Sequence, residues 1–169
     1  TPDQMYELRI AAYMHDIGKV TSPVEIVEKA KKLQTIFDRI HYVRLRMDYM
    51  IQKVKLEGQQ KKIELLEKKA DPAEIKKIES DSEEQIKELE DIRAFINKCN
   101  EPGEFLEDET LERLKEIAQR TYLDNEGQEQ PFITDDELVN LSIRRGSITE
   151  AERKKMQDHA AVTLRMLKQ

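Results

Sequence analysis

The sequence predicts an all-α fold, and three features of its 169 residues support this class. Charged residues make up 38% of the chain, aromatic residues only 5%, and Gly and Pro contribute five residues each. Few turn-forming residues among many Glu, Lys, Leu and Ile at helical spacing indicate long, solvated helices. No strand-like alternation of apolar and polar residues extends over four or more positions. We therefore expect a chain that is almost wholly helical.

The charge pattern excludes several classes of function. The formal charge of −6 comes from 29 Lys and Arg against 35 Asp and Glu, with both signs interleaved along the chain. Such a chain offers no basic patch for a nucleic acid polymer. No apolar run approaches the roughly 20 residues of a membrane span, and no segment has the order of a signal peptide. Cys99 is the single cysteine, so we expect a cytoplasmic protein without internal disulfides.

The first predicted helix covers residues 3–17. Its apolar residues recur at helical spacing, and Gly18 is expected to end it as a C-terminal stop. His15 and Asp16 would then lie in its last turn. Ser22, Pro23 and Glu25 are expected to be the N-cap, the first helical position and the capping-box partner of the helix that follows.

The apolar pattern between residues 34 and 98 predicts an antiparallel coiled-coil hairpin. Alternating steps of four and three residues form the seam of a coiled coil on each arm, and a break at Asp71–Ala73 separates the two arms. A first arm that runs from Gln34 to Lys69 would be roughly 50 Å long at about 1.5 Å per residue. The seam residues are Ile36, Ile40, Val43, Met47, Met50 and Val54 on the first arm, and Ile75, Ile78, Leu89, Ile92 and Ile96 on the second.

Three shorter helices are predicted after the hairpin. Apolar spacing places a third amphipathic helix at about residues 107–123. Thr134 with Glu137, and Thr149 with Glu152, have the three-residue separation of a capping box, and each pair is expected to begin a helix.

The segment His15–Lys19 carries the residue types of a metal-assisted phosphoester site. The adjacent His15 and Asp16 offer an imidazole nitrogen and a carboxylate oxygen to one divalent ion. Lys19 adds a mobile cation suited to a phosphate oxygen. A metal ion there would lower the pKa of a bound water, and the lysine would offset developing negative charge. A His-Asp pair at a helix end is also common in structural roles, so the pair alone leaves both interpretations open.

Two segments of the chain resemble a known family. The stretch Ala11–Val20 resembles the apolar helix and HDxGK signature of the HD superfamily of metal-dependent phosphohydrolases, especially its HD-GYP branch. The stretch Leu141–Arg153 resembles the "RGxLTxEER" segment of that branch, and Met156–His159 resembles its "MxxH". The resemblance implies that His15, Asp16 and His159 are metal ligands and that Lys19 faces a phosphate. Without it, His159 has the position of an ordinary histidine on an apolar stripe.

The resemblance also implies a domain organisation. Residues 1–30 and 141–169 would form part of an HD domain, and residues 31–140 would be a helical insertion that carries the long hairpin. The fold expected is thus all-α, with partial HD-domain helices plus an antiparallel coiled-coil insertion. Further metal ligands of the family have no counterpart in the chain, so we expect the site to be incomplete and this part alone to be inactive.

The function implied is that of a phosphodiesterase in bacterial signalling. Its substrate would be cyclic di-GMP, a cyclic dinucleotide, and its cofactors divalent metal ions, with iron or manganese favoured. An HD phosphohydrolase acting on other nucleotides is a weaker alternative. The long seam supports a different class of function, in which the hairpin is a non-catalytic signalling module that forms a homodimer.

Overall fold

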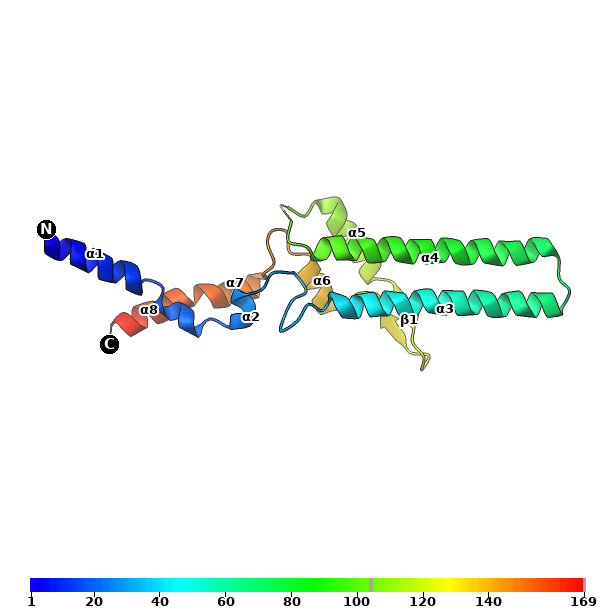
Figure 1. The fold of residues 1–169 in the computed structure, drawn as a ribbon, viewed down its shortest axis with the longest axis horizontal. Coiled ribbons are helices and arrows are strands. Elements are labelled where there is room, and N and C mark those ends of the chain that lie inside the picture. Colours follow the sequence, from blue (N-terminus) through cyan, green and yellow to red (C-terminus); the bar gives the residue numbers. More distant parts are fainter. Residues whose placement is uncertain (104, 169) are drawn as a thin grey trace.

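The computed structural model describes residues 1–103 and 105–168, and the chain is mostly helical, which confirms the all-α class. The molecule is elongated: a long helical hairpin projects from one end, and both termini lie at the other (Figure 1). None of the described helices is both long enough and apolar enough to cross a membrane. In chain order the elements are α1 (Pro2–Met14), the 3₁₀ helix η1 (Ile17–Thr21), α2 (Val24–Val27), α3 (Ile40–Glu67), α4 (Pro72–Asn100), α5 (Asp108–Ala118), β1 (Thr121–Leu123), β2 (Glu129–Pro131), α6 (Asp135–Leu141), α7 (Glu150–Gln157) and α8 (His159–Leu167).

The helices α3 and α4 form an antiparallel hairpin whose turn lies where the sequence predicts it. Asp71 caps α4 by accepting a hydrogen bond from the backbone N–H of Ala73 at 2.9 Å, and Pro72 occupies the first helical position, where its missing N–H costs nothing. Halfway along the arms the helices approach closely, because a Cβ on Gly58 would lie 2.5 Å from Ser82 Oγ. The predicted seams supply the buried residues Ile40, Val43, Met47 and Met50 of α3 and Leu89, Ile92 and Ile96 of α4.

The first arm begins six residues later than predicted. Ile36 was expected on the seam, but it lies in a loop and is 92% exposed. Local hydrogen bonds explain the late start, because Gln34 Oε1 accepts from the backbone N–H of Ala30 and Asp38 Oδ1 accepts from that of Ile40. Side chains that bond to nearby backbone in this way compete with helix formation.

The main core lies at the base of the hairpin. Side chains from α3 and α4 meet α5, α6 and the segment before α6 there. Burial of large apolar side chains is the main driving force for this packing, at roughly 1.5–3 kcal/mol for each one. Besides the hairpin residues, the cluster includes the buried residues Leu33, Cys99, Leu114, Ile117, Phe132, Ile133 and Leu141.

A small β-hairpin occupies part of the predicted third helix. That helix was expected to continue to residue 123, but α5 ends at Ala118, and β1 pairs antiparallel with β2. Gly127 makes the turn with φ = 77°, and Asp124 Oδ1 accepts hydrogen bonds from two backbone N–H groups of the turn. Tyr122, expected on the helical stripe, lies in β1 with its ring 5.8 Å from that of Tyr49 on α3. Tertiary packing therefore overrides the helical spacing here.

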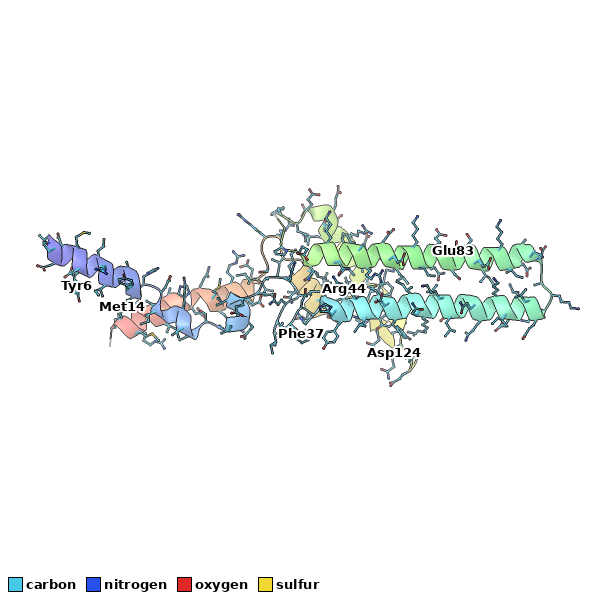
Figure 2. All side chains as sticks on the ribbon, viewed as in Figure 1. Tyr6, Met14, Phe37, Arg44, Glu83 and Asp124 are labelled. Atoms are coloured by element: carbon cyan, nitrogen blue, oxygen red, sulfur yellow. The ribbon has the colours of Figure 1, made fainter. Side chains whose placement is uncertain are left out.

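The N-terminal helix α1 has no buried residue. Figure 2 shows its side chains, including Tyr6 and Met14, projecting into open space. The predicted apolar stripe is therefore present, but no element within the described residues covers it. The next helix is also shorter than expected: α2 begins at Val24, and Ser22 does not cap it, because the Ser22 Oγ is buried without a hydrogen-bond partner.

The capping boxes predicted at Thr134 and Thr149 are confirmed, whereas the one predicted at Ser22 is wrong. Each confirmed box also anchors its helix to another element. Glu137 accepts from the backbone N–H of Thr134 and from Arg46 of α3 at 2.6 Å. Glu152 accepts from the backbone N–H of Thr149 and from Lys29 Nζ at 2.9 Å. These polar links join the hairpin base, α6, α7 and the segment after α2.

Candidate functional site

The structure brings together all four predicted site residues from the two ends of the chain. His15 is the C-cap of α1, Asp16 follows it, and Lys19 lies in η1. His159 is the first residue of α8, which packs against η1. The expectation that His15 and Asp16 belong to the last helical turn is corrected slightly, because α1 ends at Met14.

Gly18 sets the distance between η1 and α8. Its backbone N–H donates to the hydroxyl of Thr163 at 2.9 Å in a buried contact. A Cβ at this position would lie 2.1 Å from the carbonyl oxygen of His159 and 2.7 Å from the backbone nitrogen of Thr163. Gly18 was predicted to be a helix stop, yet among the described glycines only Gly127 and Gly146 have positive φ. Its actual role is to let the two helices touch, which places His159 beside Asp16.

The carboxylate of Asp16 is the centre of the cluster. Its Oδ2 lies 2.7 Å from Lys19 Nζ and 2.9 Å from His15 Nε2, and its Oδ1 lies 3.7 Å from His159 Nε2. The hydrogen bond from Lys19 holds the pKa of Asp16 below its usual range, and the charges of His15 and His159 act in the same direction against partial burial. Asp16 is therefore a carboxylate at neutral pH.

Both histidines present the same ring nitrogen to this carboxylate. His15 Nδ1 lies 2.7 Å from the carbonyl oxygen of Ala12, and His159 Nδ1 contacts the carbonyl oxygen of Met156. A ring nitrogen beside a carbonyl carries the proton, so Nε2 of a neutral ring has a free lone pair. That lone pair would face a carboxylate oxygen, and two acceptors repel unless a proton or another cation lies between them. The same anchoring of one ring nitrogen on a carbonyl is typical of metal-ligating histidines.

The side chains of the cluster are of the types that bind metal ions, but their positions in the structure are not those of a metal site. Two imidazoles and one carboxylate suit a divalent transition metal. Among residues 1–103 and 105–168, however, no group of three or more His, Cys, Asp or Glu side chains is arranged to hold a metal ion. Lys19 is instead ion-paired with Asp16. In the structure the cluster is one ion pair, between Lys19 and Asp16, with two imidazoles beside it; the His15 side chain is 67% exposed and that of His159 is 21% exposed.

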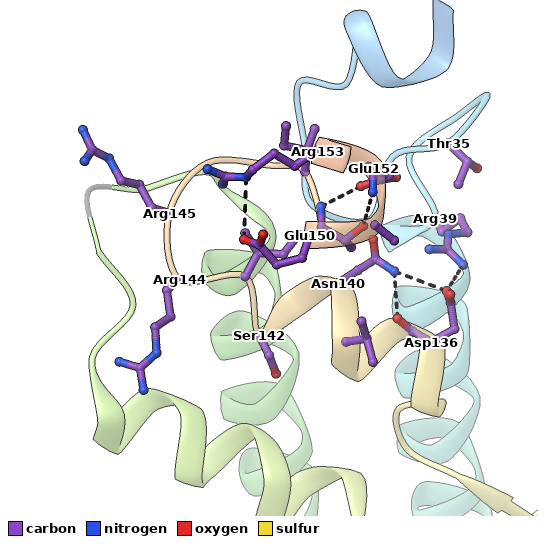
Figure 3. Close-up of a pocket in the computed structure, with 15 residues that line it drawn as sticks. Thr35, Arg39, Asp136, Asn140, Ser142, Arg144, Arg145, Glu150, Glu152 and Arg153 are labelled. Atoms are coloured by element: carbon purple, nitrogen blue, oxygen red, sulfur yellow. Dashed lines mark hydrogen bonds and ion pairs between the residues drawn. The ribbon is translucent and has the colours of Figure 1, made fainter. Parts of the chain in front are cut away.

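A larger hollow at the junction of α6 and α7 is separate from this cluster (Figure 3). It has a volume of about 760 Å³, and none of the four predicted site residues lines it. Three of its polar groups are partnered with one another, since Asp136 pairs with Arg39 and also accepts from Asn140. Figure 3 shows Arg144 and Arg145 pointing away from these groups.

No protein-family model, no curated protein and no solved structure matches this chain. Sequence reasoning missed two residues that support the site. The one indication in the sequence for Thr163 is its position four residues after His159, which places both on the same face of a helix. Lys29 carried no signal, because its partner Glu152 is distant in the sequence.

Proposed function

We propose that this chain is part of a metal-dependent phosphodiesterase of the HD type, acting on cyclic di-GMP in bacterial signalling in the cytoplasm. One observation carries the proposal: side chains from both ends of the sequence converge on the Asp16 carboxylate in the order that the two HD-like motifs imply. The substrate and the HD ancestry of the helices come from the resemblance. The geometry adds that both histidines are oriented by backbone carbonyls, as metal ligands are.

The roles of the residues follow from their contacts. His15 Nε2, His159 Nε2 and the Asp16 carboxylate would hold an iron or manganese ion. When bound, such an ion supplies an acidic water and polarises the phosphoester. Lys19, now paired with Asp16, would release the carboxylate and bind a phosphate oxygen, because its side chain is 58% exposed and flexible.

Metal binding tests the assignment. The chain would be loaded with Mn²⁺ or Fe²⁺, dialysed and analysed by plasma mass spectrometry, together with the variants His15→Ala and His159→Ala. The control is His41→Ala, which removes an exposed histidine outside the cluster. We expect the metal to be retained by the wild type and the control and lost from the two site variants. Retention of metal by His15→Ala would contradict the ligand assignment.

Turnover tests the reaction itself. Hydrolysis of cyclic di-GMP by the protein that contains this chain would be compared with that of its Lys19→Met variant. The methionine keeps the length of the side chain but removes the charge that would bind a phosphate oxygen. We expect turnover to fall in the variant while metal content is unchanged. Equal turnover would show that Lys19 has no part in catalysis.

A second candidate function is self-association through the hairpin, and exposed residues of α3 favour it. Leu56, Ile63 and Leu66 are each more than half exposed and recur at steps of seven and three residues, a coiled-coil spacing. They lie on the side of α3 that does not face α4, and no large apolar side chain of α4 is comparably exposed. We propose a second copy of this chain as the partner, with two α3 helices packed along this stripe as a coiled coil.

Sedimentation separates the two functions. Leu56→Glu with Ile63→Glu would place two charges on the stripe. Ala73→Glu with Ser80→Glu is the control, because it adds the same charge at exposed positions of α4, away from the stripe on α3. We expect the control to stay dimeric and the stripe variant to be monomeric. A wild type that sediments as a monomer, or a dimer that survives both changes, would exclude this interface.

A further inference from the structure

A second pocket lies at the base of the hairpin, where the end of α4 meets the start of α5. It has a volume of about 430 Å³, within the range of small-molecule sites. Lys32 and Cys99, both buried, line it together with Lys98 and Arg113. None of these residues contributes to the cluster around Asp16.

Lys32 is a buried cation that has no counter-ion among the described residues. The residue is 2% exposed, and its ammonium donates to the carbonyl oxygen of Leu141 at 3.2 Å. Within the described part of the chain no carboxylate lies within ion-pair distance of it. Lys29, which is equally buried, contrasts with it, because Glu152 and Asn140 both accept from its ammonium. Burial accordingly lowers the pKa of Lys32, since an ammonium taken out of water without a partner is costly.

Three further cations, Lys98, Arg113 and Arg144, line the same pocket as Lys32 and Cys99. Burial raises the pKa of Cys99, and the positive charges of Lys32, Arg113 and Lys98 oppose this rise. The guanidinium of Arg113 lies 4.3 Å from the centre of the Phe95 ring, which fixes its plane. This region therefore concentrates positive charge in a chain whose net charge is negative.

The rim supplies apolar surface and limited negative charge. Phe105 is 62% exposed, and Leu106 packs against the core cluster; both line the pocket. Of the two described carboxylates at the rim, Glu101 pairs with Lys31, and Glu107 lies at the start of α5. The described pocket thus has cations at its base and an apolar wall at its mouth.

We propose that this pocket binds a small organic carboxylate. Its carboxylate would lie between Lys32 and Arg113, and its apolar body would lie against Phe105 and Leu106. The bound anion would give the buried ammonium a counter-ion, which none of the described residues supplies. The insertion would then be a sensor of a small metabolite, a function separate from any reaction at Asp16.

Cys99, as the single cysteine, reports occupancy of the pocket directly. Its rate of alkylation by iodoacetamide would be measured by mass spectrometry with benzoate, with the uncharged analogue benzamide, and with neither. Benzoate should shield the sulfur and neutralise the nearby cations, and both effects slow alkylation. We expect at least a threefold slowing by benzoate and none by benzamide. Equal slowing by both compounds, or slowing by neither, would overturn the proposal.

A matched pair of variants tests the role of Lys32. Lys32→Met replaces the buried ammonium by an apolar chain of similar length, and Lys31→Met makes the same charge change at the neighbouring, more exposed lysine. The ratio of alkylation rates with and without benzoate is compared within each variant. We expect the effect of benzoate to disappear in Lys32→Met and to persist in Lys31→Met. Persistence in both would show that Lys32 does not bind the carboxylate.

Discussion

At the scale of single residues, Gly18 decides whether the cluster forms. The backbone of α8 occupies the space that a side chain would need, and the Gly18 N–H is hydrogen-bonded to Thr163. The contact brings His159 within 3.7 Å of the Asp16 carboxylate. The glycine of the motif is thus a packing residue, and the position of one predicted ligand depends on it.

Substitution of Gly18 by Ala tests this role. The new methyl group would meet backbone atoms that have no alternative position, so η1 and α8 must separate. We expect a loss of about 1–3 kcal/mol in the free energy of unfolding, the usual range for overpacking, measured by urea denaturation. Gly103→Ala is the control, because a Cβ there would meet no atom within 4 Å. Equal stability of the two variants would show that η1 and α8 are not in close contact in solution.

At the scale of elements, the sequence was informative where a pattern is long and local. The apolar pattern of α3 and α4 extends over many turns, and it correctly predicted two long helices and the turn between them. The capping boxes at Thr134 and Thr149 need only residues three apart and are also confirmed. The strands β1 and β2 have three residues each, too few to show an alternation of period two. The adjacency of His15 and Asp16 is local as well, but nothing except the family motif pointed to His159 as their neighbour.

The turn of the hairpin gives a prediction at this scale. Lys69 has φ = 51°, the single described non-glycine residue with a positive value. The left-handed conformation costs roughly 1–2 kcal/mol for a residue with a side chain. Lys69→Gly would remove this cost, but glycine also gives the unfolded chain more conformational entropy, which offsets part of the gain. We therefore expect the substitution to stabilise the hairpin by up to about 1 kcal/mol. Slower hydrogen exchange near the turn would be the measured sign.

The neighbouring residue provides the control. Lys68 caps α3 in the right-handed helical region, with φ = −77°, and has no strain to relieve. Lys68→Gly should therefore leave exchange unchanged or accelerate it. If both substitutions slowed exchange equally, the conformation of Lys69 would not be the cause.

At the scale of the whole molecule, buried polar residues connect the hairpin to the segments that carry the cluster. Lys29, which follows α2, pairs with Glu152 of α7 and with Asn140 of α6. Arg46 of α3 pairs with Glu137, also of α6. These contacts join residues far apart in the sequence. No periodic pattern in the sequence indicates such pairs, so they could not have been predicted.

Loss of the carboxylate of Glu152 tests this connection. In Glu152→Gln the amide can still cap α7, but the buried ammonium of Lys29 loses its counter-ion. We expect a loss of about 2 kcal/mol in stability, below the 3–5 kcal/mol of a fully buried pair because Glu152 is partly exposed. Adding Lys29→Met should recover much of this loss, since the charge left unpaired is then gone. Urea denaturation of the single and double variants gives the comparison.

The same pair predicts a dependence on pH. Burial alone would raise the pKa of Glu152, but the hydrogen bond from the Thr149 backbone and the interaction with Lys29 outweigh it and hold the pKa below 4.5. A carboxyl whose pKa is lower in the folded state stabilises the fold above its unfolded value. We therefore expect this stabilisation to be lost as the pH falls below about 4.5, and to be absent in Glu152→Gln.

The stiffness of the hairpin has a mechanical consequence. Among the described residues, Lys53 is the outermost residue of α3 that bonds to an element outside the hairpin, because its ammonium donates to the carbonyl oxygen of Leu123. From Lys53 to Glu67 the arm is about 21 Å long at 1.5 Å per residue, so it is a lever with its fulcrum where Lys53 meets β1. A rotation of about 5° at that fulcrum displaces the far turn by about 2 Å over this length. A force applied at the turn is therefore amplified at α6. From α6 it reaches α7 through Lys29, which bonds to Asn140 of α6 and to Glu152 of α7.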